Sequence, residues 1–471
     1  MGFRDYLGVF CVVAAVSGPV ALTSSAQAQS LEEALIEAYL NNPTLQAQRA
    51  QLRVTDEGVP QASAGWRPNV ELIGDITGTR SRLRTRTSRT DSTRLSQGID
   101  LRVTQNLYDG GGTDAAVEGA QADVLAARAN LISAEQSILL QVVTSYMDVL
   151  RDEAVVELNR QNVERLRRQL EATQDRYDAG VATLTDVAQA ESRIARSRSD
   201  LLTSEGDLEV SKALFEEVVG MPPTNLSTPS LAPDLPAGRA EAREISVEQN
   251  PSVLAAIYSR RAALHSIDEQ FADLLPSVDV IGTLSRSWDE NSNGSRSRSY
   301  SLAAQVTVPI YQQGFETSEV RAAKMAAAQA LMEIEEARRD VVEQTLSAWE
   351  SYTSVVATIT AIQEEIRAAE IALEGVQQEE RVGQRTVLDV LDAEQELLDA
   401  NVSLVRARRD ETVARFELIA ALGSLTARDL DLDVQFYDPG VHYNAVEALW
   451  WGIGDDVPTD ATDAAARGVE P

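Results

Sequence analysis

The chain has 471 residues, of which 73 are acidic and 42 are basic, for a formal net charge of −31 at pH 7. With one cysteine and two histidines, the composition argues against disulfide scaffolds, cysteine-ligated zinc, thiol catalysis, histidine-rich metal sites and histidine-based triads. The strong negative charge also argues against nucleic acid as the main partner.

Residues 1–28 have the pattern of a secretory signal peptide. Arg4 precedes an apolar run from Val9 to Val16, and Ala26 and Ala28 supply the small side chains that cleavage requires. Cleavage would also remove the single cysteine. No later run approaches the roughly 20 apolar residues that a membrane-spanning helix needs. We therefore expect an exported protein without a helical membrane anchor.

The most informative feature of the sequence is an internal duplication. Asn42-Pro43 matches Asn250-Pro251 at an offset of 208 (250 minus 42). Other matched pairs share an offset of 203 (383 minus 180), and they are Tyr108 with Tyr311, Gly180 with Gly383, Asp186 with Asp389, and Gly220 with Gly423. The offset changes between Pro68 and Leu107, which predicts a shorter loop there in the second copy.

The duplication and the composition divide the mature chain into four parts. The first repeat covers 29–220, and the second repeat covers 244–425. A proline-rich connector, 221–243, separates them. The acidic C-terminal segment, 426–471, follows the second repeat, and we expect it to be partly disordered.

Each repeat begins with a predicted helical stretch, at 31–65 and 244–275, and ends in a much longer helical pattern. Within 113–178 the apolar residues form two adjacent seams, one from Leu139 to Leu150 and one from Ile138 to Val149. The second repeat has corresponding seams between Val341 and Ile359. Two seams favour a helix packed on both flanks, as in a cylinder of helices, whereas the alternative is a plain coiled coil. A helix of this length would measure roughly 100 Å.

Four segments between these helices read as β-strands, at 69–79, 95–107, 277–287 and 300–310. Val103 and Val306 belong to the apolar face of the alternation, and Thr104 and Thr307 to the polar face. This pattern is typical of tilted membrane strands, although a half-buried strand of a soluble sheet shows it too. Four strands are too few to form a closed barrel, and an open sheet edge is unstable in lipid because its backbone groups have no hydrogen-bond partners there. A membrane-spanning sheet would therefore pool strands from several chains, and three chains would give twelve.

The tip of the first hairpin, 80–94, is rich in arginine among serine and threonine. Its arginines are Arg80, Arg82, Arg84, Arg86, Arg89 and Arg94. One interpretation is a solvated loop. The other is that Arg82, Arg84 and Arg86 contact phosphates of an outer-leaflet glycolipid.

Several of these motifs resemble those of the TolC-like outer-membrane efflux proteins, over essentially the whole mature sequence. Leu107 to Gly111 and Val308 to Gly314 are similar to the strand-to-helix junctions of that family, with Gly110, Gly111 and Gly314 as the junction glycines. Gly383 to Glu394 and its counterpart from Gly180 to Val187 are similar to the turns that join the helices of each hairpin.

The resemblance implies a mainly α-helical fold with a membrane β-barrel part. It implies a homotrimer with a shared twelve-stranded barrel in the outer membrane and a helical tunnel across the periplasm. It further implies docking to a periplasmic adaptor and an inner-membrane transporter, either an ABC transporter or a proton-driven pump. The chain would then be an export duct for tripartite efflux or type I secretion that does no chemistry and needs no cofactor or metal.

In this family, residues beside the turn glycines line the closed periplasmic entrance, which here implies Asp186, Arg385, Asp389 and Asp392. Asp389 and Asp392 occupy neighbouring positions on one helix face. However, Thr183 and Asp186, like Thr386 and Asp389, also fit a capping box, which explains both acids without any gate. The second repeat has Glu380 where relatives often carry an aromatic residue, and we expect Glu380 to pair with an arginine. We also expect Arg385 to pair with Asp186 of an adjacent coil.

Two other classes of function compete with a duct. A soluble periplasmic coiled-coil adaptor or scaffold would leave the alternating strands unexplained, and an exported enzyme would need a clustered acid, base or metal site. A stand-alone porin does not need helices of about 65 residues. The cargo is not evident from the sequence, although only five methionines occur, which disfavours a copper duct.

Overall fold

The computed structural model describes residues 29–231, 233–290 and 294–452. The predicted signal peptide, 1–28, and the end of the acidic segment, 453–471, lie outside the described residues. The first repeat contains α1 (Leu31–Asn41), α2 (Pro43–Asp56), α3 (Gly58–Ser63), the short 3-10 helix η1 (Ala64–Trp66), β1 (Asn69–Arg84), β2 (Arg89–Tyr108), α4 (Gly112–Asp178) and α5 (Leu184–Val219). In the second, α6 (Arg239–Gln249) begins within the predicted connector, and α7 (Pro251–Ala272), β3 (Ser277–Trp288), β4 (Arg296–Thr307), α8 (Phe315–Arg381) and α9 (Val387–Leu422) follow; α10 (Gly440–Val446) comes after the repeat.

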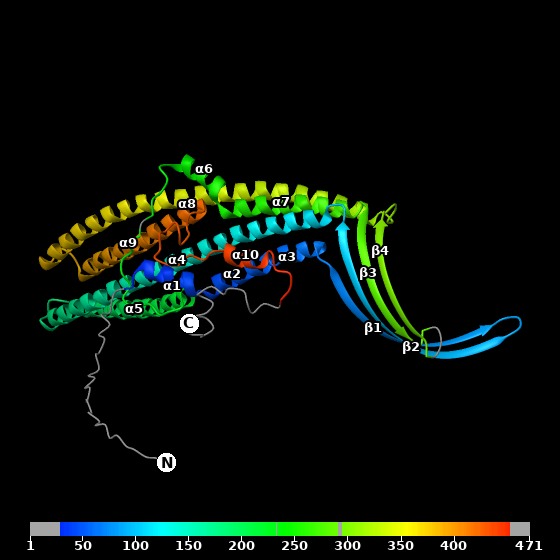
Figure 1. The fold of residues 1–471 in the computed structure, drawn as a ribbon. Helices are drawn as coiled ribbons and strands as arrows, with labels where there is room; N and C mark the ends of the chain where they lie inside the picture. The colour runs from blue at the N-terminus through cyan, green and yellow to red at the C-terminus, as the bar shows by residue number, and fades with distance from the viewer. Residues whose placement is uncertain (1–28, 232, 291–293, 453–471) are drawn as a thin grey trace, which may run out of the picture.

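The molecule is elongated, with a layer of long helices at one end and a curved four-stranded sheet at the other (Figure 1). The two long helices, α4 and α8, have 67 residues each, which corresponds to about 100 Å. They fold back into the 36-residue helices α5 and α9. The turns of these two hairpins lie at the end farthest from the sheet (Figure 1).

The predicted helical stretches 31–65 and 244–275 are not single helices, because each breaks at an Asn-Pro pair. Asn42 Oδ1 accepts hydrogen bonds from the amides of Thr44 (2.9 Å) and Leu45 (3.2 Å), and so caps α2. Its Nδ2 donates to the carbonyl oxygen of Val218 at the end of α5 (2.9 Å). Proline occupies the first helical position, and it forces the preceding residue out of the helical conformation.

The second repeat copies this arrangement at Asn250, so the break belongs to the duplicated unit. Asn250 Oδ1 accepts from the Ser252 amide (2.9 Å), and Nδ2 donates to the Ala421 carbonyl oxygen (3.0 Å) at the end of α9. Because α7 begins where α9 ends, these two short helices together follow the length of α8.

The main hydrophobic core joins α1, α2, α4 and α5 to the last part of α9 and the chain that follows it. The predicted apolar seams of α4 are confirmed, since Leu139, Val142, Val143, Tyr146 and Val149 are all fully buried. The Tyr146 hydroxyl donates within the core to the carbonyl oxygens of Gln29 (2.9 Å) or Ser227 (2.6 Å). Part of the acidic C-terminal segment belongs to the same core, because Ala427, Leu430 and Leu432 are buried in it.

The corresponding seams of α8 are mostly half-buried within one chain. Val341 is buried and Trp349 packs against α6 and α9, but Val356 is 38% exposed. Nearer the start of α8, Met325 and Met332 are 68% and 59% exposed. This helix therefore carries apolar surface that a single chain leaves uncovered.

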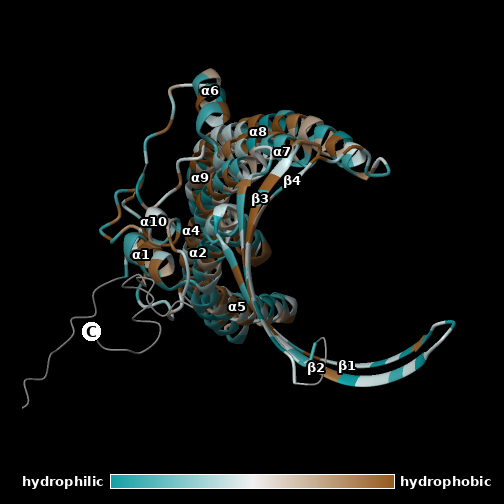
Figure 2. Cartoon of the chain, turned by 45° about the vertical axis from the view of Figure 1, so that its right-hand side comes forward, coloured by the Kyte–Doolittle hydropathy of each residue, from teal (hydrophilic) through white to brown (hydrophobic). Residues whose placement is uncertain are grey.

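The four strands form one antiparallel sheet in the order β1-β2-β3-β4. The register aligns the apolar positions of all four strands, as in the row Leu72, Leu101, Leu284 and Tyr300. The neighbouring row on the opposite face is Ile73, Asp100, Ser285 and Ser299. One face of the sheet is therefore predominantly apolar and the other predominantly polar, and the alternation is visible along the strands in Figure 2.

The difference in length between the two repeats lies in the strands and not in the loop that we predicted. The first hairpin has strands of 16 and 20 residues, whereas both strands of the second have 12. The pairing of the first hairpin continues as far as Arg84 opposite Arg89. Most of the predicted loop 80–94 is therefore strand, because an alternating run of threonine, serine and arginine remains compatible with cross-strand pairing.

Candidate functional site

The helical mouth, defined here as the two hairpin turns with their flanking helix ends, is built by glycines in a left-handed conformation. Gly180 has φ 77° and Gly383 has φ 78°, a backbone conformation that favours glycine. The amide of Gly180 donates to the Tyr177 carbonyl oxygen, and that of Gly383 to the Glu380 carbonyl oxygen, both at 2.9 Å. Each turn thereby satisfies the carbonyl groups at the end of a long helix.

Asp186 and Asp389 both complete capping boxes at the start of the short helices. Asp186 Oδ2 accepts from the Thr183 amide and hydroxyl (2.8 Å each), and the Asp186 amide donates to the Thr183 hydroxyl (3.2 Å). Asp389 makes the same contacts with Thr386. In each case the hydrogen bonds from the backbone and the side chain of the threonine lower the pKa of the carboxyl group.

Arg385 pairs within its own turn and not with Asp186 in this chain. Its Nε lies 2.8 Å from Glu379 Oε2, and both side chains are about half exposed. This contact raises the pKa of Arg385. The pairing of Arg385 with Asp186 of an adjacent coil stays a prediction.

Two ion pairs connect the first helical hairpin to the second near the mouth. Arg193 of α5 pairs with Asp392 of α9, and Arg176 of α4 pairs with Glu380 of α8. The predicted pairing of Glu380 with an arginine is confirmed. Neither Arg193 nor Arg176 was predicted from the sequence, because partners 199 and 204 positions apart leave no local pattern.

A small apolar cluster supports these ion pairs. Leu166 of α4 and Ile194 of α5 pack against Val387 and Leu391 of α9. Ile194 follows Arg193 in the chain and Leu391 precedes Asp392, so the cluster positions both members of that ion pair. The mouth therefore combines an apolar contact between hairpins with two ion pairs.

The predicted strand-to-helix junctions contain glycines at positive φ, namely Gly110 (76°), Gly111 (89°) and Gly314 (85°). A Cβ at Gly110 would lie 2.9 Å from the Ala272 carbonyl oxygen, so no side chain fits there. Asp109 closes the first junction, since its carboxylate accepts from the amides of Gly111 (3.0 Å) and Thr113 (2.8 Å). Burial opposes ionisation of Asp109, but the hydrogen bond from the Thr113 hydroxyl, together with those from the two amides, outweighs it and lowers the pKa of Asp109.

The arginines proposed for glycolipid contact lie at the opposite end of the molecule from the mouth. Arg82 pairs with Asp91 across the hairpin at 3.4 Å, which lowers its availability for phosphate. Arg84 ends β1, and Arg86 lies in the short turn that follows, and both are exposed.

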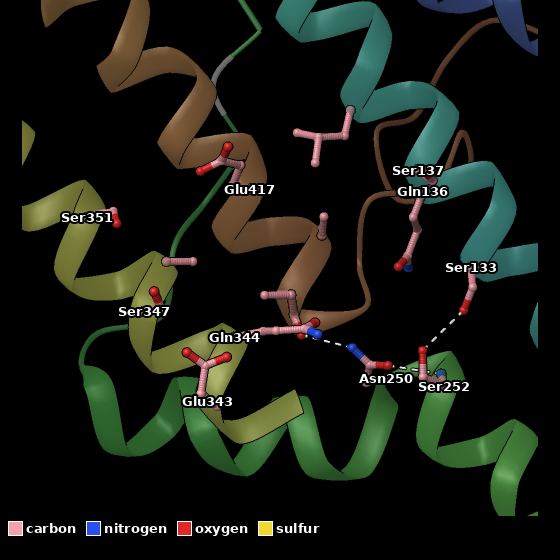
Figure 3. A pocket seen from close by; sticks show the side chains of 14 residues that line it. Ser133, Gln136, Ser137, Asn250, Ser252, Glu343, Gln344, Ser347, Ser351 and Glu417 are labelled. Carbon is pink, nitrogen blue, oxygen red and sulfur yellow. Dashed lines mark hydrogen bonds between the residues drawn. The ribbon is translucent and has the colours of Figure 1, made fainter. Parts of the chain in front are cut away.

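A polar pocket of about 440 Å³ lies between α4, α8 and the point where α9 meets α7 (Figure 3). Glu343 and Glu417 contribute carboxylates, and burial raises the pKa of Glu417. Gln136 of α4 also lines it, and its Nε2 has no hydrogen-bond partner within the described chain. The pocket thus lies between the two hairpins, at the level where α9 ends and α7 begins.

The described residues have two further properties. Among residues 29–231, 233–290 and 294–452, no helix is both long and apolar enough to cross a membrane. The same residues contain no group of three or more His, Cys, Asp or Glu side chains arranged to hold a metal ion.

Comparison with known proteins identifies the family. The model of the outer membrane efflux protein family matches residues 34–220 and 243–424. The chain belongs to the outer membrane efflux protein family. It is 34% identical to outer membrane efflux protein BepC of Brucella suis over 94% of this chain and 96% of that protein. It is 28% identical to outer membrane protein TolC of Vibrio cholerae over 87% of this chain and 94% of that protein.

The fold agrees with this assignment. The crystal structure of VceC, an outer membrane protein of Vibrio cholerae, matches with a TM-score of 0.72 at 20% identity, over 83% of this chain and 96% of that one. In this fold the barrel closes only on trimerisation, because four strands per chain leave two open edges. The family member described here is thus an outer-membrane export channel that extends into the periplasm, and the alternative of a soluble adaptor is wrong.

Proposed function

We propose that three copies of this chain form one continuous duct that receives cargo from an inner-membrane transporter through a periplasmic adaptor. The observation that carries this proposal is the combination of a four-stranded sheet with two unpaired edges, β1 and β4, and helices of about 100 Å. Three sheets joined at those edges give the twelve strands of a closed barrel. The exposed apolar surface of α8 supports the same assembly, since a neighbouring chain would cover it.

The mouth is the part of the duct that would open. Separation of the α4/α5 hairpin from the α8/α9 hairpin would break the Arg193–Asp392 and Arg176–Glu380 ion pairs. Both are partly exposed, so each contributes only about 0–1 kcal/mol. A docked adaptor that binds the separated hairpins more tightly would shift the equilibrium towards the open mouth.

The polar pocket gives the moving hairpins a point of weak packing. Gln136 lies on one hairpin, and Glu343 and Glu417 lie on the other. Water can replace contacts between polar side chains at little cost, whereas separation of an apolar seam would expose hydrophobic surface. We propose that the hairpins separate on the mouth side of the core around Tyr146, because that core also contains Val413, Phe416 and Ile419 of α9 and so holds the two hairpins together beside the pocket.

The chain itself performs no chemical step in this proposal and carries no cofactor or metal. Energy for transport comes from the inner-membrane partner, which is either an ABC transporter, for type I secretion, or a proton-driven pump, for efflux of small molecules. At the other end of the duct, Arg84 and Arg86 contact phosphates of outer-leaflet glycolipid.

Two measurements test the proposal. Mass measurement of the detergent-extracted protein should give three chains, and a stable monomer that needs no detergent would contradict the assembly. Crosslinking in cells, followed by identification of the inner-membrane protein captured, then distinguishes an ABC transporter from a proton-driven pump.

A further inference from the structure

The segment after α10 extends to the foot of the sheet. His442 Nδ1 lies 3.1 Å from the buried Asp56 Oδ2 on α2, and the Arg128 guanidinium of α4 lies 5.2 Å from the ring centroid of Tyr443. Val446 is fully buried. These contacts fix α10 beside α2 and direct the following residues towards the start of β1 (Figure 1).

This segment presents three apolar side chains to solvent. Leu449, Trp450 and Trp451 are 42%, 67% and 91% exposed. The Arg67 guanidinium lies 5.6 Å from the ring centroid of Trp450. Arg67 is followed by Pro68 and then by Asn69, the first residue of β1, so the tryptophan pair lies at the level where the sheet begins.

The sheet itself carries exposed aromatic residues at that level. A bulge between Asn106 and Tyr108 brings Tyr108 opposite Val278, which pairs in turn with Val306 on the apolar face. Tyr108 is 46% exposed, and Tyr311, just beyond β4, is 82% exposed. Membrane barrels have aromatic girdles where their apolar band meets the headgroups. The tyrosines therefore indicate the boundary between barrel and periplasm.

We propose that Trp450 and Trp451 insert into the headgroup region of the inner leaflet of the outer membrane and extend this girdle from outside the barrel. Tryptophan prefers the interface because its large ring favours apolar surroundings while its N–H keeps a polar partner. Two adjacent exposed tryptophans are unfavourable in water, and the lipid beside the foot of the barrel is the apolar surface that continues the apolar face of the sheet. The segment is thus a peripheral lipid anchor on the periplasmic side.

Fluorescence quenching in vesicles of phospholipid brominated at different depths tests the anchor. The assembled protein would carry Trp66→Phe, Trp288→Phe and Trp349→Phe, which leaves the pair as its sole tryptophans. Their emission should decrease most with lipid brominated near the headgroup and less with lipid brominated deep in the acyl chains. The matched control keeps only Trp349, midway along α8, and its emission should be the same in all vesicles.

Two outcomes would overturn the proposal. Emission typical of water and unchanged by brominated lipid would show that the pair stays in the periplasm. Blue-shifted emission unchanged by brominated lipid would show that it packs against another copy of the chain.

If the triple substitution prevents assembly, the otherwise native protein can be compared with the double variant Trp450→Ser and Trp451→Ser. The double variant should then lose the component quenched by the shallow bromine, and an unchanged component would contradict the anchor.

Discussion

Arg193 of α5 forms an ion pair with Asp392 of α9 and so connects the two helical hairpins near their turns. The Asp392 side chain is 58% exposed and that of Arg193 is 29% exposed, so solvent screens the pair. One such pair contributes about 0–1 kcal/mol, and three in a trimer contribute up to about 3 kcal/mol. This is the scale on which a docked partner can shift an equilibrium between closed and open states.

Arg193→Ala should increase single-channel conductance in planar bilayers, because it removes one of the two ion pairs that hold the hairpins together. Arg198→Ala is the matched control, since it removes the same charge from an exposed position of α5. Arg385→Ser should have a smaller effect, because Arg385 pairs with Glu379 of its own turn. Equal conductance in the Arg193 and Arg198 variants would contradict this role of the ion pair.

Substitutions of the two partners should change the block by divalent cations in opposite directions. Asp392→Asn removes a carboxylate from the mouth and should weaken the block, whereas Arg193→Ala leaves that carboxylate unneutralised and should strengthen it. Conductance recorded against increasing Mg²⁺ measures both effects, and the yield of trimer should stay constant. A block that neither substitution changes would show that Asp392 does not line the pore.

The capping contacts predict a pH dependence of stability. Threonine hydrogen bonds lower the pKa values of Asp186 and Asp389 below the ordinary 3.8. A carboxyl group with a lowered folded-state pKa stabilises the fold above its unfolded-state pKa, and that contribution is lost as the pH falls through the folded-state pKa. The melting temperature should therefore decrease as the pH falls below about 4. The double variant Asp186→Asn and Asp389→Asn should have a lower melting temperature at pH 7. That temperature should decrease less on acidification than in the native protein, and the conductance should be unchanged. A changed conductance at neutral pH would assign these residues to the gate.

The register of the sheet predicts which strand positions tolerate charge. Val103→Asp and Val306→Asp place a carboxylate on the apolar face, where ionisation in lipid is costly, so the yield of assembled trimer should fall. Thr104→Asp and Thr307→Asp, on the polar face, should assemble nearly as well as the native protein. Gel separation of trimer from monomer without boiling measures the difference. Equal yields from both pairs would exclude a lipid-facing apolar surface.

The Asn-Pro junctions predict a loss of stability at two equivalent sites. Asn42→Ala removes the cap of α2 and leaves the Val218 carbonyl oxygen without its donor. Asn250→Ala removes the cap of α7 and leaves the Ala421 carbonyl oxygen with only the longer hydrogen bond from the Thr345 hydroxyl (3.4 Å). Each should lower the free energy of unfolding by about 1–2 kcal/mol. Asn41→Ala is the matched control, because the Asn41 side chain makes only a solvent-exposed hydrogen bond, to the Glu37 carboxylate one turn away. Denaturant unfolding of the solubilised protein gives the values, and similar losses in all three variants would contradict the capping role.

Local sequence patterns were sufficient to predict much of the structure of this protein. The duplication, the helices without internal proline, the alternation of the strands and the capping boxes at Thr183 and Thr386 all depend on residues a few positions apart, and the structure contains each of them. The chemistry of a helix start or of a two-residue repeat is local, because the groups that satisfy the backbone lie within one turn or on the neighbouring position.

Tertiary structure decided what depends on distant segments. Asn42 ends one helix and bonds to Val218 only because α5 returns beside α1, so the sequence showed the repeated pair but not the break it makes. Arg193 forms an ion pair with Asp392, and Arg67 contacts the ring of Trp450, although about two hundred or more positions separate the partners in the sequence. No periodicity of the sequence predicts such contacts. A single charge or ring has many candidate partners in an acidic chain of this length, and packing of the long helices selects one of them.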